Sequence, residues 1–368
     1  MDWQKGLARL VHSIEGGFDR LKYRLGSRQN GHNPVMIMPY LGFGSNEFIE
    51  LKGRVIEDTG VQPSRETDGI WHNLLNMYRR FESDEVPFAQ IEARFGGVEI
   101  KVDADDEGFF QVDIELDQPL DAEQSWQHVE LELLKPESSE KRWIRADGKV
   151  LVVSPQAEFG VISDLDDTVL FTGVNRPLKM MRTVLLNNAR TRSPFKGVAD
   201  FYSALQLGFY GNGRNPLFYV SSSPWNMYDL LQEFFHIHEI PVGPIFLRDW
   251  GFERQSMLAV NNRQYKLEAI CNILEKLPDL NFILIGDSGE EDAEIYTEII
   301  QSYPGRILAA YIRSVRRDFN RENEINQLSE KAGEFGSGLM YAADTQVMVE
   351  HAAQQGWIRS SPISEPIE

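Results

Sequence analysis

The chain has 368 residues, which is long enough for two ordinary domains and a sizeable hydrophobic core. Its composition, with 42% hydrophobic and 25% charged residues, is typical of a soluble globular protein. The formal net charge of −19 argues against a nucleic-acid partner, because a nucleic-acid binder needs a broad basic surface.

The cysteine content and the hydropathy of the chain indicate the cellular compartment in which the protein is expected. The single cysteine, Cys271, cannot form a disulfide within the chain, which favours a reducing compartment. Its apolar neighbours in AICNIL indicate a small core side chain rather than a nucleophile. No apolar stretch is long enough to span a bilayer, and the N-terminus lacks the apolar stretch of a secretory signal. We therefore expect a cytoplasmic protein.

Residues 2–25 have an apolar side chain at every third or fourth position, which predicts an amphipathic helix. The helix is basic although the chain as a whole is acidic, so it could lie on an anionic membrane. Its apolar face could instead pack on the body of the protein or on a second subunit, which is the more common use of such a stripe. With the polar linker that follows, it makes up residues 1–33.

Residues 34–155 contain stretches in which apolar and polar side chains alternate, as they do in strands with one buried face. Turn-like clusters separate the four clearest stretches, which are residues 47–56, 97–103, 109–117 and 128–134. We predict a small antiparallel β-domain with a helical insertion at 69–81. Its histidines, His72 and His128, are isolated, and the acidic positions of 109–117 are expected on a solvated strand face. No catalytic group is therefore predicted in this region.

From about residue 156 onward, apolar runs alternate with helical segments. Strands that are buried on both faces and separated by helices indicate an α/β fold with a Rossmann-like, mainly parallel sheet. The predicted strands are FGVIS, PLFYVS, GPIFL, NFILIG and RILAAYI, and the predicted helices lie near 198–207, 225–238, 264–276 and 290–302. A further helix is predicted at 339–358, at the end of a domain of residues 156–358, before a tail at 359–368.

Polar side chains follow three of these strands, and open parallel sheets collect their chemistry at the carboxyl ends of strands. The residues concerned are Asp164–Thr168 (DLDDT), Ser221, and Gly286–Asp287 with Asp292, joined by Lys266 near the start of a helix. Clustered carboxylates repel one another, and a hard divalent cation, best Mg²⁺, would remove that repulsion. With a hydroxyl and an ammonium group opposite, the set forms a phosphate cradle and suggests phosphoryl transfer.

These motifs, in this order, resemble the haloacid dehalogenase-like phosphatases, which carry DxDx[TV] after the first strand, then Ser or Thr, Lys, and an acidic GD motif. Within that superfamily, DLDDTV, YVSSSPWN, FLRDWG and IGDSGEEDAEIY are similar to the phosphatidate phosphatases of the actin-patch-protein type, which are related to the lipins. The resemblance covers about residues 156–315. The upstream β-domain and the C-terminal helix are consistent with bacterial members of the group.

The resemblance implies a role for each matching aspartate. Asp164 would attack the phosphorus and form an aspartyl-phosphate, as carboxylate nucleophiles do. Asp166 would protonate the leaving alkoxide and then activate water. Mg²⁺ would be held by the Asp164 carboxylate, the backbone carbonyl of Asp166 and Asp287, with Asp292 as an outer ligand, and would offset the developing negative charge.

By the same resemblance, Ser221 and Lys266 would bind the non-bridging oxygens of the phosphate. Two assignments stay open. Ser222 could replace Ser221 if the strand ends one residue later, and Glu291 could take the place of Asp292.

The expected function is a Mg²⁺-dependent phosphomonoester hydrolase that converts phosphatidate to diacylglycerol and phosphate. The gap of about fifty residues between Thr168 and Ser221 leaves little room for a large cap domain, so the site would be open to a bulky phospholipid at a membrane surface. The N-terminal helix would make the peripheral contact. The alternatives are a phosphatase of another bulky or soluble phosphoester, and a non-catalytic phospholipid-binding module. The presence of both Asp164 and Asp166 favours an enzyme, because a binding module needs neither.

Overall fold

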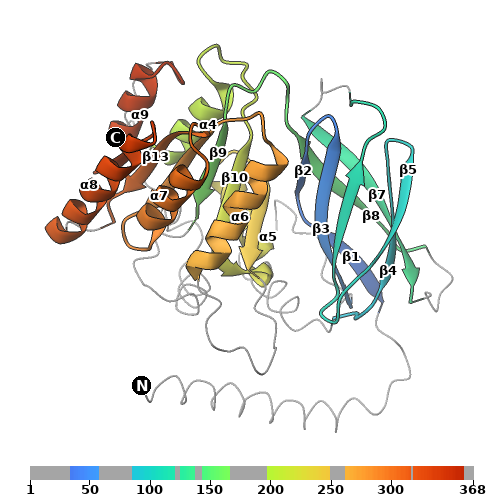
Figure 1. Cartoon of the computed structure of the whole chain (residues 1–368). Coiled ribbons are helices and arrows are strands. Elements are labelled where there is room, and N and C mark those ends of the chain that lie inside the picture. The colour runs from blue at the N-terminus through green and yellow to red at the C-terminus, as the bar shows by residue number, and fades with distance from the viewer. Residues whose placement is uncertain are drawn as a thin grey trace, which may run out of the picture.

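The structure is a computed structural model that describes residues 34–57, 85–120, 125–136, 143–165, 197–248, 262–315 and 318–359. These residues form two β-sheets, one with helices packed on both of its faces (Figure 1). The predicted helices at 2–25 and 69–81, and all but the first residue of the tail at 359–368, lie outside the described residues. So does Asp166.

The described part of the α/β region contains a six-stranded sheet in the order β11-β10-β9-β12-β13-β14, and every neighbouring pair is parallel. The strands are β9 (Gly160–Asp164), β10 (Leu217–Pro224), β11 (Ile245–Arg248), β12 (Phe282–Asp287), β13 (Ile307–Arg313) and β14 (Gly338–Ala342). The five predicted strands are all present, so the predicted α/β fold with a parallel sheet is confirmed. The central position of β9 places the end of FGVIS between β10 and β12.

Helices pack on both faces of this sheet. One face carries α4 (Val198–Leu207), α5 (Tyr228–Ile237), which follows the short 3₁₀-helix η3 (Trp225–Met227), and α9 (Thr345–Gln354); the other carries α6 (Asn262–Lys276), α7 (Asp292–Ser302) and α8 (Phe319–Glu334). Side chains of the central strands alternate between the two layers, as Val161 and Ile162 do. Burial on both faces explains why these strands are continuous apolar runs.

The prediction of a single helix at 339–358 is wrong in its first part. Gly338–Ala342 forms β14, which pairs with β13, and the helix α9 begins only at Thr345. Between them, the side chain of Asp344 accepts a hydrogen bond from the backbone N–H of Val347 and caps α9. The apolar run LMYAA is too short for its periodicity to distinguish a strand from a helix, so pairing with β13 decides its conformation.

The upstream region forms an eight-stranded sheet, called here the β-rich sheet. Its strands are β1 (Val35–Pro39), β2 (Gly42–Gly44), β3 (Phe48–Glu57), β4 (Gln90–Phe95), β5 (Val98–Asp103), β6 (Phe109–Glu115), β7 (Trp126–Lys135) and β8 (Arg145–Val152). Four of these, β3, β5, β6 and β7, match the predicted stretches. The pairing is antiparallel as predicted, with one correction: the short strand β2 runs parallel to β8, so the sheet is mixed.

Alternation along β6 agrees with the sequence pattern. Val112 and Ile114 are buried in the core that the β-rich sheet encloses, whereas Asp113 and Glu115 are exposed. The acidic positions therefore lie on a solvated face, as predicted.

The single cysteine, Cys271, is half-buried in α6 against the core beneath that helix, which agrees with a packing role. Burial raises the pKa of its thiol.

The β-rich sheet packs directly on the β10–β11 side of the parallel sheet. The ring of Phe43 in β2 lies 5.5 Å from that of Phe218 in β10 and joins the core beneath α6. The ring of Tyr40 stacks on Trp225 with 4.2 Å between centroids. Apolar and aromatic groups thus join the two sheets over several contacts.

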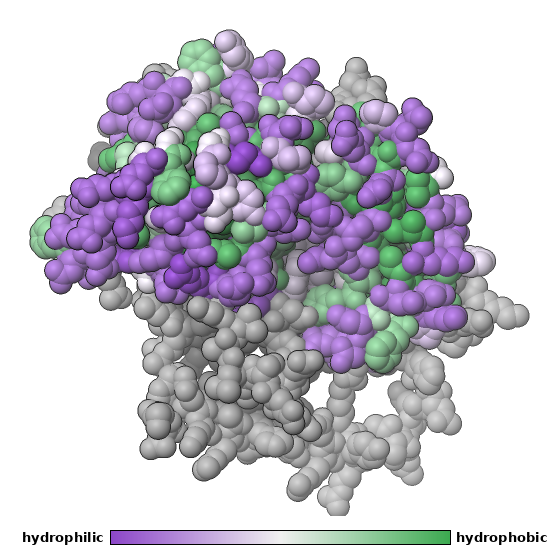
Figure 2. Space-filling view, in the orientation of Figure 1, coloured by the Kyte–Doolittle hydropathy of each residue, from purple (hydrophilic) through white to green (hydrophobic). Residues whose placement is uncertain are grey.

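Hydrophilic side chains cover most of the face formed by α6, α7 and α8 (Figure 2). Among the described helices, none is both long enough and apolar enough to cross a lipid bilayer. Those predicted site residues that the structure describes lie at the carboxyl edge of the parallel sheet.

Candidate active site

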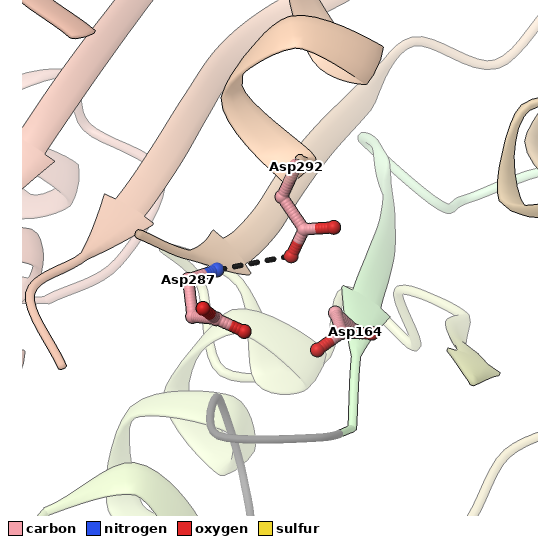
Figure 3. A group of neighbouring side chains, drawn as sticks. All are labelled: Asp164, Asp287 and Asp292. Atoms are coloured by element: carbon pink, nitrogen blue, oxygen red, sulfur yellow. Dashed lines mark hydrogen bonds between the residues drawn. The ribbon is translucent and has the colours of Figure 1, made fainter. Parts of the chain in front are cut away.

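Three aspartates meet at the carboxyl edge of the parallel sheet (Figure 3). Asp164 is the last residue of β9, Asp287 is the last residue of β12, and Asp292 is the first residue of α7. One carboxylate oxygen from each lies within 4.8 Å of the other two. All three residues are at most 2% exposed. The structure thus brings together three of the four aspartates that the sequence predicted as a metal site, and the fourth, Asp166, lies outside the described residues.

Strand pairing and one glycine explain this meeting. Parallel pairing of β9 with β12 sets Ser163 opposite Ile285, so the aspartates that end the two strands are neighbours. Gly286 makes room for Asp292: a Cβ atom at position 286 would lie 2.4 Å from the Oδ2 atom of Asp292. The same Cβ would lie 2.8 Å from the hydroxyl of Tyr296. The glycine before Asp287 is therefore required by the close approach of α7.

The carboxylate of Asp287 uses one oxygen within the protein and leaves the other for a ligand. Its Oδ1 accepts hydrogen bonds from the backbone N–H groups of Gly289 and Glu290. Its Oδ2 is buried and has no hydrogen-bond partner among the described residues. Burial, and then the charge of Asp292, raise the pKa of Asp287 to about 8. A buried carboxylate oxygen without a donor is suited to bind a hard cation.

Asp292 is held in place by the turn that precedes it. Its Oδ2 accepts a hydrogen bond from the backbone N–H of Asp287 at 3.0 Å, drawn as a dashed line in Figure 3. The neighbouring Glu291 is exposed. Of the two residues that the sequence left open, Asp292 is therefore the one beside the other aspartates.

Lys266 lies within this acidic cluster. Its Nζ atom is 2.7 Å from Oδ1 of Asp164, 2.8 Å from Oδ1 of Asp292 and 2.9 Å from Oε2 of Glu290. Burial alone would lower the pKa of Lys266, but these carboxylates raise it well above the ordinary value, so the side chain stays charged. When ionised, the three buried aspartates and Glu290 together exceed the positive charge of this one ammonium group. A divalent cation would offset this excess of negative charge.

The predicted serine also lies at this edge. Ser221 follows Val220, whose Cα pairs with that of Asp164 in the neighbouring strand. The Oγ atom of Ser221 accepts a hydrogen bond from the backbone N–H of Ser223 at 3.0 Å. Ser221 and Ser222, the two alternatives from the sequence, are both buried here.

The structure adds a residue that no sequence pattern indicated. Arg321 in α8 donates from Nε to the carbonyl oxygen of Ser288 and from Nη2 to that of Glu290, so it braces the loop between Asp287 and α7. Its guanidinium is held in turn by the carboxylate of Glu294. Sequence periodicity carries no signal for such a contact, because it joins two separate helices.

Comparison with known proteins agrees with this geometry. Residues 159–314 match the family model described as "Phosphatidate phosphatase APP1, catalytic domain". Phosphatidate phosphatase APP1 of Saccharomyces cerevisiae is 35% identical over 187 residues, which are 48% of this chain and 31% of that protein. The α/β segment is thus similar to the catalytic domain of this phosphatase family. An uncharacterised protein of Schizosaccharomyces pombe is 33% identical over 193 residues, which are 52% of this chain and 31% of that protein.

The alignments thus span about a third of the length of these relatives. Among solved structures, a carbohydrate acetylesterase from Xanthomonas citri aligns with 80% of this chain and 72% of its own. Its sequence identity is 11% and its TM-score is 0.28, which is too low to indicate a shared fold. The relationship therefore rests on the phosphatase segment, which contains every described residue of the acidic cluster.

Proposed function

We propose that the protein is a Mg²⁺-dependent phosphatidate phosphatase that works through an aspartyl-phosphate. The observation that carries this proposal is the buried cluster of Asp164, Asp287 and Asp292 around Lys266, in a segment that matches a phosphatase catalytic domain. The proposed substrate is that of the yeast relative, a phosphatidate phosphatase.

The residues present fit a hard divalent cation. All the donors are carboxylate oxygens, which Mg²⁺ prefers, and Oδ2 of Asp287 is buried without a donor among the described residues. Asp164 and Asp287 would coordinate the ion directly, and Asp292 would be an outer ligand. When bound, Mg²⁺ supplies positive charge next to the reacting phosphate.

In the proposed reaction, the carboxylate of Asp164 attacks the phosphorus while the bond to the leaving alkoxide breaks. Asp166, which follows the described end of β9, gives a proton to that alkoxide. It then takes a proton from the water that attacks the aspartyl-phosphate, so that phosphate leaves and Asp164 is restored. Lys266 holds positive charge beside Asp164, and the hydroxyl of Ser221 would donate to a phosphate oxygen.

The test is phosphate release from phosphatidate in mixed micelles, with Mg²⁺ or with a chelator. We expect Asp164→Asn and Asp287→Asn to lower release by a factor on the order of 10³ or more, because each removes a group that acts on the phosphate. Asp147→Asn, an exposed aspartate of the β-rich sheet, is the matched control and should behave like the wild type. Release by Asp164→Asn at the wild-type rate would contradict the mechanism.

A second measurement follows the ion alone. Mg²⁺ should raise the melting temperature of the wild type, because a ligand that binds only the folded state stabilises it. Asp287→Asn should lose this response and Asp147→Asn should keep it. Rapid phosphate release from soluble phosphoesters, with none from phosphatidate, would support the proposed mechanism but contradict phosphatidate as the substrate.

A further inference from the structure

A shallow recess lies at the joint between the β-rich sheet and the turn that follows β10. Met38, Tyr40 and Arg54 line it on the side of the β-rich sheet. Trp225 and Asn226 of the turn line it on the other side. One side therefore comes from the β-rich sheet and the other from η3, and only their packing creates the recess.

The wall of the recess is connected to the candidate active site through strand β10. Val220 of β10 pairs with Asp164, and the chain runs from there through Ser221 and the end of β10 directly into Trp225. At about 3.3 Å per residue, Trp225 lies no more than roughly 17 Å beyond the level of Asp164. This is an upper limit, and a phosphatidate with its phosphate at Asp164 extends its ester groups and then its acyl chains over this range of distances.

The wall of the recess is a rigid aromatic surface. Tyr40 and Trp225 stack with 4.2 Å between ring centroids and 23° between planes, and the edge of Tyr228 lies 4.7 Å from Tyr40. The backbone N–H of Leu41 donates to the hydroxyl of Tyr228 at 2.7 Å, which fixes the stack. Trp225 and Met38 remain half-exposed. An ordered ring beside a flexible thioether suits aliphatic groups of variable shape.

Among the lining residues, Arg54 is already paired and Asp229 is acidic, so the recess carries no surplus positive charge. The guanidinium of Arg54 lies 3.1 Å from the carboxylate of Glu85 and donates from Nε to the carbonyl oxygen of Glu107 at 2.9 Å. It also lies over the ring of Phe109, at 4.3 Å from the centroid, and donates to Asn226. A neutralised arginine does not favour a second anionic group. The recess therefore suits an uncharged group with a few polar atoms.

We propose that this recess binds the uncharged glycerol-ester end of a phosphatidate whose phosphate lies at Asp164. This inference rests on the proposed function, and it gives the β-rich sheet a part in substrate selection. Trp225 is the residue that contacts the substrate, and Tyr40 and Arg54 position it.

The test compares two monomeric substrates in the presence of Mg²⁺: dihexanoyl phosphatidate, and glycerol 3-phosphate, which has the phosphate but no acyl ester. We expect Trp225→Ala to raise KM for dihexanoyl phosphatidate about tenfold, the loss typical of an anchoring aromatic side chain. KM and kcat for glycerol 3-phosphate should stay the same. Trp225→Phe should recover most of the affinity, because it keeps an aromatic face. Trp143→Ala removes an exposed tryptophan before β8 and should change neither substrate.

Equal loss on both substrates would overturn the proposal, since it would mean that Trp225 only braces the strand that carries Ser221. No change on either substrate would overturn it too. Failure of the wild type to release phosphate from both would count against the proposed function instead. In that case, binding of dihexanoyl phosphatidate to Asp164→Asn, followed as a melting-temperature shift, still decides: the shift should disappear in Asp164→Asn/Trp225→Ala and persist in Asp164→Asn/Trp143→Ala.

Discussion

The helix α6 carries a lysine in an acidic cluster near each of its ends, and the two clusters differ in burial and charge. Near the start, Lys266 is 3% exposed and touches two fully buried aspartates and one partly exposed glutamate. At the end, the side chain of Lys276 is 36% exposed, and its Nζ atom lies 3.4 Å from both Glu50 and Asp113 of the β-rich sheet. The ammonium group also lies 5.3 Å from the ring centroid of Phe48.

The two clusters differ in how the charges of their carboxylates and their lysine compare. Around Lys276, one lysine faces one buried and one half-exposed carboxylate, and the group joins a helix to a sheet. Around Lys266, three buried aspartates outnumber the ammonium group, and Asp287 has a raised pKa and a buried oxygen without a donor among the described residues. Excess charge in a dry site has a free-energy cost, and a bound cation would offset it.

Substitution of the two lysines tests the difference between the clusters most directly. Lys266→Met leaves Asp164 and Asp292 buried without their cation, and we expect it to lower the free energy of unfolding by about 3–5 kcal/mol. Urea denaturation measures this loss, and Mg²⁺ should restore part of it because it replaces the positive charge. Lys276→Met is the matched variant, with an expected loss of about 1 kcal/mol because its ammonium group is partly solvated. Equal losses in the free energy of unfolding would show that the two lysines stabilise the fold to the same extent.

A second variant tests how tightly α7 packs against the buried cluster. Gly286→Ala places a Cβ atom 2.4 Å from the Oδ2 atom of Asp292, so α7 must shift. We expect a loss of about 1–3 kcal/mol in the free energy of unfolding, as for other overpacked sites, and a weaker stabilisation by Mg²⁺. Thermal unfolding with and without the ion measures both.

The control for that variant is Gly333→Ala. Gly333 lies in α8, and in the described part of the chain nothing beyond the adjoining backbone lies within 4 Å of where its Cβ would be. Alanine should therefore add about 0.5–1 kcal/mol of helix stability. A Gly286→Ala protein as stable as the wild type, with an unchanged response to Mg²⁺, would show that Asp292 is not held against β12.

The smallest expected effect concerns the joint and depends on pH. Burial, and then Asp113, raise the pKa of Glu50 above its ordinary value of 4.5, so ionisation of Glu50 lowers stability as the pH rises above that value. Lys276 offsets part of this cost. The stability difference between wild type and Lys276→Gln should therefore be smaller at pH 4 and grow to about 1 kcal/mol at pH 7. A difference that does not vary with pH would instead assign Lys276 a packing role over Phe48.

Much of the α/β part follows from sequence alone. The strands β9, β10 and β12 are continuous apolar runs because both of their faces are buried, and the residues that end them must meet at one edge of a parallel sheet. For this reason Asp164, Ser221 and Asp287 can be predicted as neighbours without any structure. Their order along the chain, with Lys266, also carries the family resemblance.

Other features depend on contacts between segments that are far apart in the chain. Periodicity cannot decide whether 338–342 is strand or helix, since the available partner β13 decides it. The choice of Asp292 over Glu291, and the need for Gly286, depend on how α7 approaches β12.

The same holds for the joint between the sheets. Nothing local in the sequence relates Tyr40 to Trp225 or Lys276 to Glu50, yet these pairs set the β-rich sheet against the elements that carry Ser221 and Lys266. The sequence by itself determined which residues end the central strands, because local hydrophobic patterns record burial. Only the tertiary structure decided how those ends, one helix start and a second sheet come together, because that depends on packing between distant segments.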